Sequence, residues 1–187
     1  YKLWFQSHRS AIIPKREQKW LKTATRIEAV DVSVDAFGIG TLPVMTYYWE
    51  NKEANKEAPL VMLVHGWTGR GNQMGAFDEP LLKAGFRVLA FDNHAHDKTP
   101  GNSTHIFIQS AVQRALAEKL GPIFGIVAHS FGGMVTPYSL SQGMQAQKVV
   151  CISPPSHFDF LLARFTQSLH LPKGIQNYMM NRFKKEY

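Results

Sequence analysis

The chain has 187 residues, of which 44% are hydrophobic, and it carries a formal net charge of +7. This length and composition suit one globular domain with a sizeable core, and the lack of any apolar run of about eighteen residues excludes a membrane-spanning helix. The single cysteine, Cys151, excludes an internal disulfide, and its apolar neighbours predict a small buried hydrophobic side chain.

The positive charge is concentrated at the two ends of the chain. Within residues 1–26 the basic side chains alternate with Trp4, Phe5 and Trp20. Such an arm could contact an anionic membrane or nucleic acid. We favour docking of its aromatic side chains on the domain, and we predict no nucleic-acid partner because no motif of that kind accompanies the charge. The predicted location is cytoplasmic, although the first residue is Tyr1 rather than Met, which leaves an upstream signal or anchor open.

The apolar pattern predicts two kinds of strand. Alternating and β-branched residues over 26–34 and 42–50 predict an antiparallel pair, and residues 50–58 form a charged loop. Continuous apolar runs then predict buried strands over 60–64 and 123–128, and the pattern predicts further strands over 86–91 and 148–153. Helical spacing predicts helices over 74–85, 103–121 and 131–143, the last despite Pro137.

Strands that alternate with helices predict an α/β fold, with a mostly parallel sheet flanked by helices. The expected division is a basic arm (1–26), a core (27–156) that includes the antiparallel N-terminal pair, and a helical segment (157–187) with apolar faces at helical spacing. In such a sheet the functional loops leave the carboxyl ends of the strands. Three of these ends, HGWTGRG, DNHAHD and HSFGG, are polar and glycine-rich, and we expect them to cluster in space.

Ser130 occupies the third of these strand ends, between a buried strand and a helix. A side chain at the tip of so tight a turn needs small neighbours and a strained backbone. Ala128 and Gly132 are the small neighbours, and Gly133 allows the helix to pack closely. The N-terminus of that helix favours an oxyanion beside the hydroxyl. The alternative is a serine that only caps the helix.

Residues 27–187 resemble the α/β-hydrolase family, through HG after one strand, D after the next and AHSFGG at the turn. The resemblance implies that Ser130 is the nucleophile and that the N–H groups of Phe131 and Trp67 are the oxyanion donors. His65 and Gly66 then belong to the HG motif, and His129 is a packing or orienting residue. Ala128 departs from the family pattern, where glycine is commonest.

His94, His96 and Asp97 raise the alternative of a metal site. Their spacing does not fit the H-x-H-x-D-H motif of the metallo-β-lactamases, because Asp97 directly follows His96 and no histidine comes next. The α/β-hydrolase resemblance instead implies that His96 keeps its usual family position. We therefore predict no metal and no cofactor.

The sequence does not complete a catalytic triad. A serine hydroxyl needs an imidazole base and an orienting carboxylate, which this family supplies after later strands. Asp159, with His157 or His170 as base, is a candidate set within the helical segment, which resembles a cap. We favour the alternative that about 60–90 further residues, two strand and helix units, carry the acid and base.

The resemblance therefore implies a serine hydrolase that acts on an ester, a thioester or a related acyl bond of a small-molecule substrate. A serine nucleophile argues against the dehalogenase and epoxide-hydrolase branches, which use aspartate at this position. The alternative is a non-catalytic hydrolase-like binding protein or a fragment that functions by association. The sequence leaves the oligomeric state open.

Overall fold

The structure is a computed structural model that describes residues 1–9, 11–51 and 58–186. It has two units: a sheet unit, Gln6–Pro154, and a helical unit made of Tyr1–Phe5 and Pro155–Tyr187. Residues 1–26, which the sequence placed in one arm, are thus divided between the two units. Most of the expected charged loop over 50–58 lies outside the described residues.

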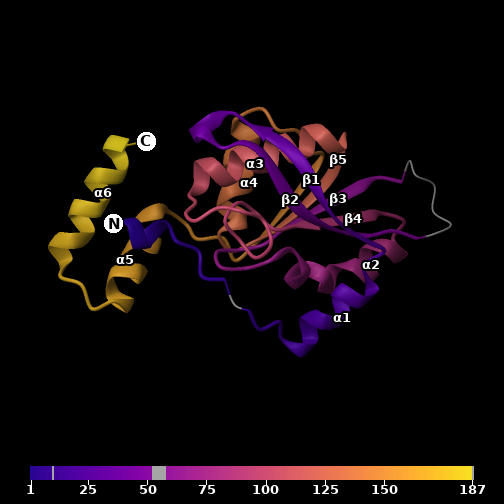
Figure 1. Cartoon of the computed structure of the whole chain (residues 1–187), viewed down its shortest axis with the longest axis horizontal. Helices are drawn as coiled ribbons and strands as arrows, with labels where there is room; N and C mark the ends of the chain where they lie inside the picture. The colour runs from indigo at the N-terminus through magenta and orange to yellow at the C-terminus, as the bar shows by residue number, and fades with distance from the viewer. Residues whose placement is uncertain (10, 52–57, 187) are drawn as a thin grey trace. The chain divides into compact units, whose positions relative to one another are not determined.

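The described strands of the sheet unit form one mixed sheet in the order β1-β2-β4-β3-β5-β6 (Figure 1). The strands are β1 (Arg26–Val34), β2 (Gly40–Trp49), β3 (Leu60–Val64), β4 (Arg87–Phe91), β5 (Ile123–His129) and β6 (Lys148–Ile152). The pairs β1–β2 and β2–β4 are antiparallel, whereas β4–β3, β3–β5 and β5–β6 are parallel. The predicted fold class, a mostly parallel sheet with an antiparallel N-terminal pair, is confirmed.

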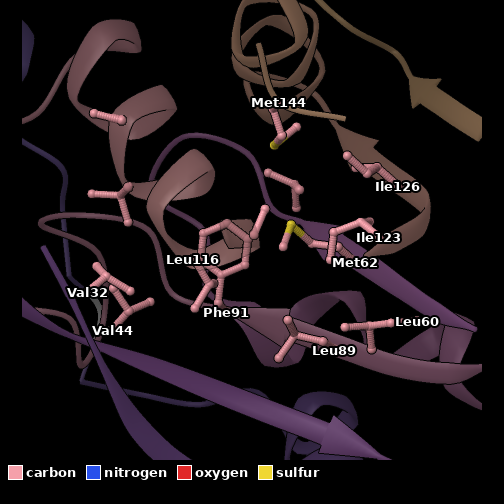
Figure 2. Packing of buried hydrophobic residues seen from close by; sticks show 14 of the residues in the cluster. Val32, Val44, Leu60, Met62, Leu89, Phe91, Leu116, Ile123, Ile126 and Met144 are labelled. Carbon is pink, nitrogen blue, oxygen red and sulfur yellow. The ribbon is translucent and has the colours of Figure 1, made fainter. Parts of the chain in front are cut away.

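Helices cover both faces of this sheet (Figure 1). They are α1 (Lys15–Thr23), η2 (Ala36–Gly38), η3 (Gly71–Phe77), α2 (Asp78–Lys83), α3 (Ile106–Leu120) and α4 (Gly132–Ser141). On one face Val112 and Leu116 of α3 pack with Met62 and Phe91 in the larger core cluster (Figure 2). On the other face Trp20 of α1 joins the cluster around Tyr47, Trp49, Val61 and Met74. Burial on both faces explains the continuous apolar strands.

The helix starts differ from the sequence expectation in three places. Helix α1 was not predicted, because its basic residues suggested a solvated arm. The helix predicted over 74–85 is a 3-10 helix, η3, followed by the short α2. Helix α3 begins at Ile106 rather than at residue 103, and the His105 ring caps it by accepting the Ile108 N–H at 3.4 Å. An imidazole nitrogen can replace the usual hydroxyl cap because it also accepts one N–H.

Strand β6 forms one edge of the sheet. Val149 and Val150 are exposed, Val150 to 54%, and Cys151 is only partly buried. The prediction of a buried Cys151 is therefore wrong, because β6 is paired on one side only, with β5, in the described sheet. An edge strand of this kind presents unpaired N–H and C=O groups.

The helical unit contains α5 (Phe158–Ser168), α6 (Lys173–Glu186) and the 3-10 helix η1 (Lys2–Phe5). Its core is aromatic: the Trp4 ring lies 4.8 Å from Phe165 and 5.6 Å from Phe158, and Phe158 stacks on Phe183 at 4.4 Å. Trp4 and Phe5 are thus packed with α5 and α6. No helix among the described residues has the length and apolar character to cross a bilayer.

Candidate active site

Ser130 lies in the turn that joins β5 to α4. Its φ is 51°, in the left-handed region that residues other than glycine rarely adopt. The Ser130 N–H donates to Ile152 O on β6 at 2.9 Å, and the Gly133 N–H donates to Ser130 O at 2.8 Å. The serine is therefore half-exposed on a strained turn at the carboxyl edge of the parallel strands.

This turn packs closely against the end of β3. A Cβ added to Gly66 would lie 2.9 Å from Ser130 Cβ, and a Cβ added to Gly132 would lie 2.6 Å from His65 O. On the other side of the turn, a Cβ on Gly133 would lie 2.9 Å from Pro154 Cβ. Glycine at these positions lets the two strand ends and α4 approach closely enough to bring Gly66 beside Ser130.

Gly132→Ala is expected to lower the free energy of unfolding by about 1–3 kcal/mol, because the methyl group would overlap backbone oxygens of Val64 and His65. Urea unfolding measures this change. Gly125→Ala on β5 is the matched control, since its Cβ would meet Val61 Cγ2 at 3.7 Å, an ordinary contact. Equal stability of the two variants would contradict the close approach of α4 to β3.

Two backbone N–H groups belong to residues that follow the contact between Gly66 and Ser130. The Phe131 N–H is at the start of α4, and the Trp67 N–H belongs to the residue after Gly66. Within the part of the chain that the structure describes, neither N–H donates to another protein group. The Trp67 and Phe131 rings meet edge to face with centroids 5.2 Å apart. Both N–H groups are therefore without a backbone acceptor among the described residues.

His65 links the ends of β3 and β4. Its Nδ1–H donates to Gly66 O at 2.7 Å, and its Nε2 accepts the Asn93 N–H at 3.0 Å. Burial, with a smaller effect of His96, lowers the pKa of His65 to about 3, so the ring is neutral. Because both ring nitrogens are engaged, His65 supports the backbone of the site and is not placed to act as a base.

His96 makes a similar link one loop further on. Its Nδ1–H donates to His94 O at 2.9 Å, and its Nε2 accepts the Thr68 N–H at 3.2 Å. Burial lowers the pKa of His96 to about 4. The Asp97 carboxylate faces Arg70, with Oδ1 3.9 Å from Nη1. His96 and Asp97, which we considered as metal ligands from the sequence, thus both have protein partners.

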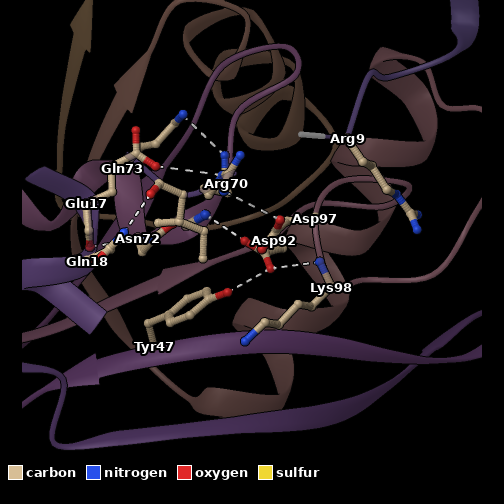
Figure 3. A network of polar contacts seen from close by, with 12 residues as sticks. Arg9, Glu17, Gln18, Tyr47, Arg70, Asn72, Gln73, Asp92, Asp97 and Lys98 are labelled. Carbon is tan, nitrogen blue, oxygen red and sulfur yellow. Dashed lines mark hydrogen bonds and ion pairs between the residues drawn. The ribbon is translucent and has the colours of Figure 1, made fainter. Parts of the chain in front are cut away.

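Asp92 is fully buried at the end of β4 and accepts three hydrogen bonds (Figure 3). The donors are Gly71 N–H at 2.6 Å, the Tyr47 hydroxyl at 2.9 Å and Lys98 N–H at 3.2 Å. Burial raises the pKa of Asp92 to about 6, and the three donors partly offset that rise. Burial and Asp92 together raise the pKa of Tyr47. This carboxylate fixes the loop after β3 to β4.

The other candidate residues are His129, next to Ser130, and three residues of the helical unit. His129 is exposed at the end of β5. His157 precedes α5, with Nδ1 2.7 Å from Ser156 Oγ, Asp159 lies in the first turn of α5, and His170 follows α5. These three belong to the helical unit, so their role in a triad stays a prediction.

Sequence reasoning missed Arg70 and the role of Asp92. Asp92 had a signal, a carboxylate directly after a buried strand, where ionisation is costly unless donors surround it. Arg70 had none, because its partners, Glu17 and Asp97, are distant from it in the chain.

Residues 59–184 match the alpha/beta hydrolase fold family, and the chain belongs to this family. Among solved structures, an esterase from Pyrococcus furiosus is 21% identical with a TM-score of 0.65, covering 94% of this chain and 66% of its own. Est1E from Butyrivibrio proteoclasticus, solved with ferulic acid bound, is 19% identical with a TM-score of 0.60, covering 73% and 57%. An epoxide hydrolase from Vigna radiata is 22% identical with a TM-score of 0.51, covering 67% and 38%.

Comparison with curated proteins gave no match. The chain spans 66% or less of the length of the three solved structures named above. At these identities, all below 25%, the likeness to the three solved structures shows a shared fold and nothing finer.

Proposed function

We propose that the protein is a serine hydrolase that cleaves an ester, a thioester or a related acyl bond, with Ser130 as nucleophile. The observation that carries this proposal is the strained turn at Ser130, with φ of 51°, packed against Gly66 at the end of β3. A capping serine needs no left-handed backbone, and strain of this kind is typical of functional sites.

In the proposed reaction Ser130 Oγ attacks the acyl carbon and passes its proton to a base. The carbonyl oxygen becomes an oxyanion, which the Trp67 and Phe131 N–H groups stabilise. The tetrahedral intermediate then breaks its bond to the alcohol or thiol, which leaves with the proton, and water later hydrolyses the acyl-serine. Neither His65 nor His96 is the base in this proposal, because both ring nitrogens of each histidine are already hydrogen-bonded.

The substrate we propose is a small molecule with an apolar or aromatic acyl group. The support is the pair of rings beside the two donors, Trp67 and Phe131, which offers an apolar surface next to the reacting carbon. The ferulic acid bound to Est1E is an aromatic acid, and that complex gives the proposal a precedent within the fold.

One observation favours a second candidate, a hydrolase-like binding protein without catalysis. Among the described residues of the sheet unit, no histidine is hydrogen-bonded to Ser130 Oγ, and the rings of His65 and His96 are already engaged. Such a protein would retain the two donors and would bind acyl compounds without turnover.

A fluorophosphonate probe tests the proposal, because it phosphorylates only an activated serine. In the full-length protein we expect one adduct by intact mass, located on Ser130 by peptide mapping and absent from Ser130→Ala. Equal labelling of the wild type and Ser130→Ala would overturn the assignment of the nucleophile. No labelling of the folded wild type would support the binding protein.

A further inference from the structure

Glu17 is a buried carboxylate that the proposed reaction does not use. It lies on α1 and is 1% exposed, and its Oε2 is 3.7 Å from Nε of Arg70, which is 4% exposed. A buried ion pair is often no more stabilising than apolar residues of the same size, so stability alone does not explain it. Ion pairs of this type can instead fix one arrangement of the chain.

Arg70 connects three parts of the sheet unit (Figure 3). It belongs to the β3 loop, defined here as residues 65–71, and it follows Trp67 by three residues. Its Nε faces Glu17 on α1, and its Nη1 lies 3.9 Å from Asp97 Oδ1 in the loop after β4. A planar guanidinium can hold two carboxylates in fixed directions, which a lysine ammonium cannot do as well.

The β3 loop is short and strongly hydrogen-bonded, so a shift at Arg70 would reach Trp67. The Gly69 N–H donates to Gly66 O at 3.1 Å, the Thr68 N–H donates to His96 Nε2, and the Gly71 N–H donates to Asp92 Oδ1. Between the two ends of this loop lies the Trp67 N–H. Its position relative to Ser130 therefore depends on where Arg70 is held.

Helix α1 provides a firm support for Arg70. Asn72 Nδ2–H donates to Glu17 O at 3.4 Å, and Trp20 packs in the core cluster on this face of the sheet. Helix α1 also lies outside residues 59–184, the range that matches the family. The support is thus supplied by a part of this chain that the family match does not include.

We propose that Glu17 is a positioning residue: by holding Arg70 against α1, it sets the β3 loop so that the Trp67 N–H faces the oxyanion formed at Ser130. This proposal rests on the proposed function for its catalytic consequence. Neither Glu17 nor Arg70 touches the substrate, because both side chains are buried away from the surface.

Three variants of the full-length protein test this role. Glu17→Gln removes the charge at constant volume. The double variant Glu17→Met with Arg70→Met replaces the whole ion pair by apolar side chains, and such replacements usually keep a protein folded. Glu79→Gln is the matched control, because it also removes one carboxylate from an ion pair, the exposed pair with Lys83 on α2.

The first readout does not depend on activity. Amide hydrogen exchange is followed at Thr68, Gly69 and Gly71, whose N–H groups are all bonded in the β3 loop. We expect exchange about tenfold faster or more in Glu17→Gln and in the double variant, with β5 amides and Glu79→Gln unchanged. Unchanged exchange at these three amides in Glu17→Gln would overturn the proposal. This result is decisive by itself, even if the double variant does not fold.

The second readout separates positioning from stability. In both variants we expect kcat for p-nitrophenyl butyrate to fall about 10- to 100-fold and the Ki of butylboronic acid, which forms a tetrahedral adduct, to rise by a similar factor. KM should stay within about threefold, because ground-state binding does not need the oxyanion donor. A folded double variant with wild-type kcat and Ki would show that the pair is only structural. If Ser130 of the wild type fails to react with fluorophosphonate, the proposed function falls, while the exchange experiment still decides the positioning of the loop.

Discussion

Replacing Ser130 by alanine is expected to lower turnover of p-nitrophenyl butyrate by about 10⁶ in the full-length protein. Without the hydroxyl no acyl-serine forms, and only the two N–H donors and substrate binding remain, which in serine proteases leave about 10³–10⁴ over the uncatalysed rate. KM should change little, because the hydroxyl contributes to the transition state far more than to binding. Initial rates at saturating substrate measure the effect.

Ser141→Ala is the control for this experiment. Ser141 is exposed at the end of α4, and its hydroxyl donates to Tyr138 O at 2.7 Å. The same change of side chain in the same helix should therefore leave turnover near the wild-type value. A loss of less than about tenfold in Ser130→Ala would contradict a nucleophilic Ser130 and point to general-base attack by water.

The stability of the protein should depend on pH through Asp92. Burial raises its pKa in the folded protein to about 6, from an ordinary value of 3.8. The folded state therefore holds this proton more tightly than the unfolded chain. The contribution of Asp92 to the free energy of unfolding is therefore largest below about pH 4. It decreases by about 3 kcal/mol in total as the pH rises to about 6, and it is constant at higher pH.

Urea unfolding at several values between pH 4 and pH 7 measures this effect when the wild type is compared with Asp92→Asn. His65 and His96 have lowered pKa values, so their contributions to the free energy of unfolding rise with pH over the same range. The wild type and Asp92→Asn both contain these histidines, so their contributions cancel when the two proteins are compared. The asparagine cannot titrate, and it loses acceptor capacity toward the Tyr47 hydroxyl and two N–H groups. Relative to the variant, the wild type should lose stability from pH 4 to pH 6. A difference that does not vary with pH would show that Asp92 titrates normally.

The parts of the fold that the sequence predicted are those that depend on local apolar pattern. The run Leu60–Val64 is buried on both faces and forms β3 over the same residues, as predicted. The pattern failed for α1, in which four of nine residues are Lys or Arg, because its buried side comprises a few residues and one of them is Glu17. It predicted β6 as a strand over nearly the same residues, but it did not predict the partial exposure of Cys151 on that strand.

The site could be predicted to the extent that it depends on strand ends. Parallel strands bring their carboxyl ends together, so Gly66 and Ser130 were expected to be close, and the structure puts them in contact. The ion pair of Glu17 with Arg70 could not be predicted in this way. Its two residues are separated in the chain by the whole of β1, β2 and β3, and no periodic pattern connects them.

The division of the chain has a consequence for biosynthesis. Residues 1–5 are synthesised before the sheet unit, but their partners in the helical unit are α5 and α6, and Tyr1 donates to Glu186 across 185 positions. The sheet unit, by contrast, is continuous over Gln6–Pro154 and can fold as soon as this stretch has been synthesised. Trp4 and Phe5 therefore remain exposed to solvent or chaperones throughout that period, and they reach their final packing only after α5 and α6 have been synthesised.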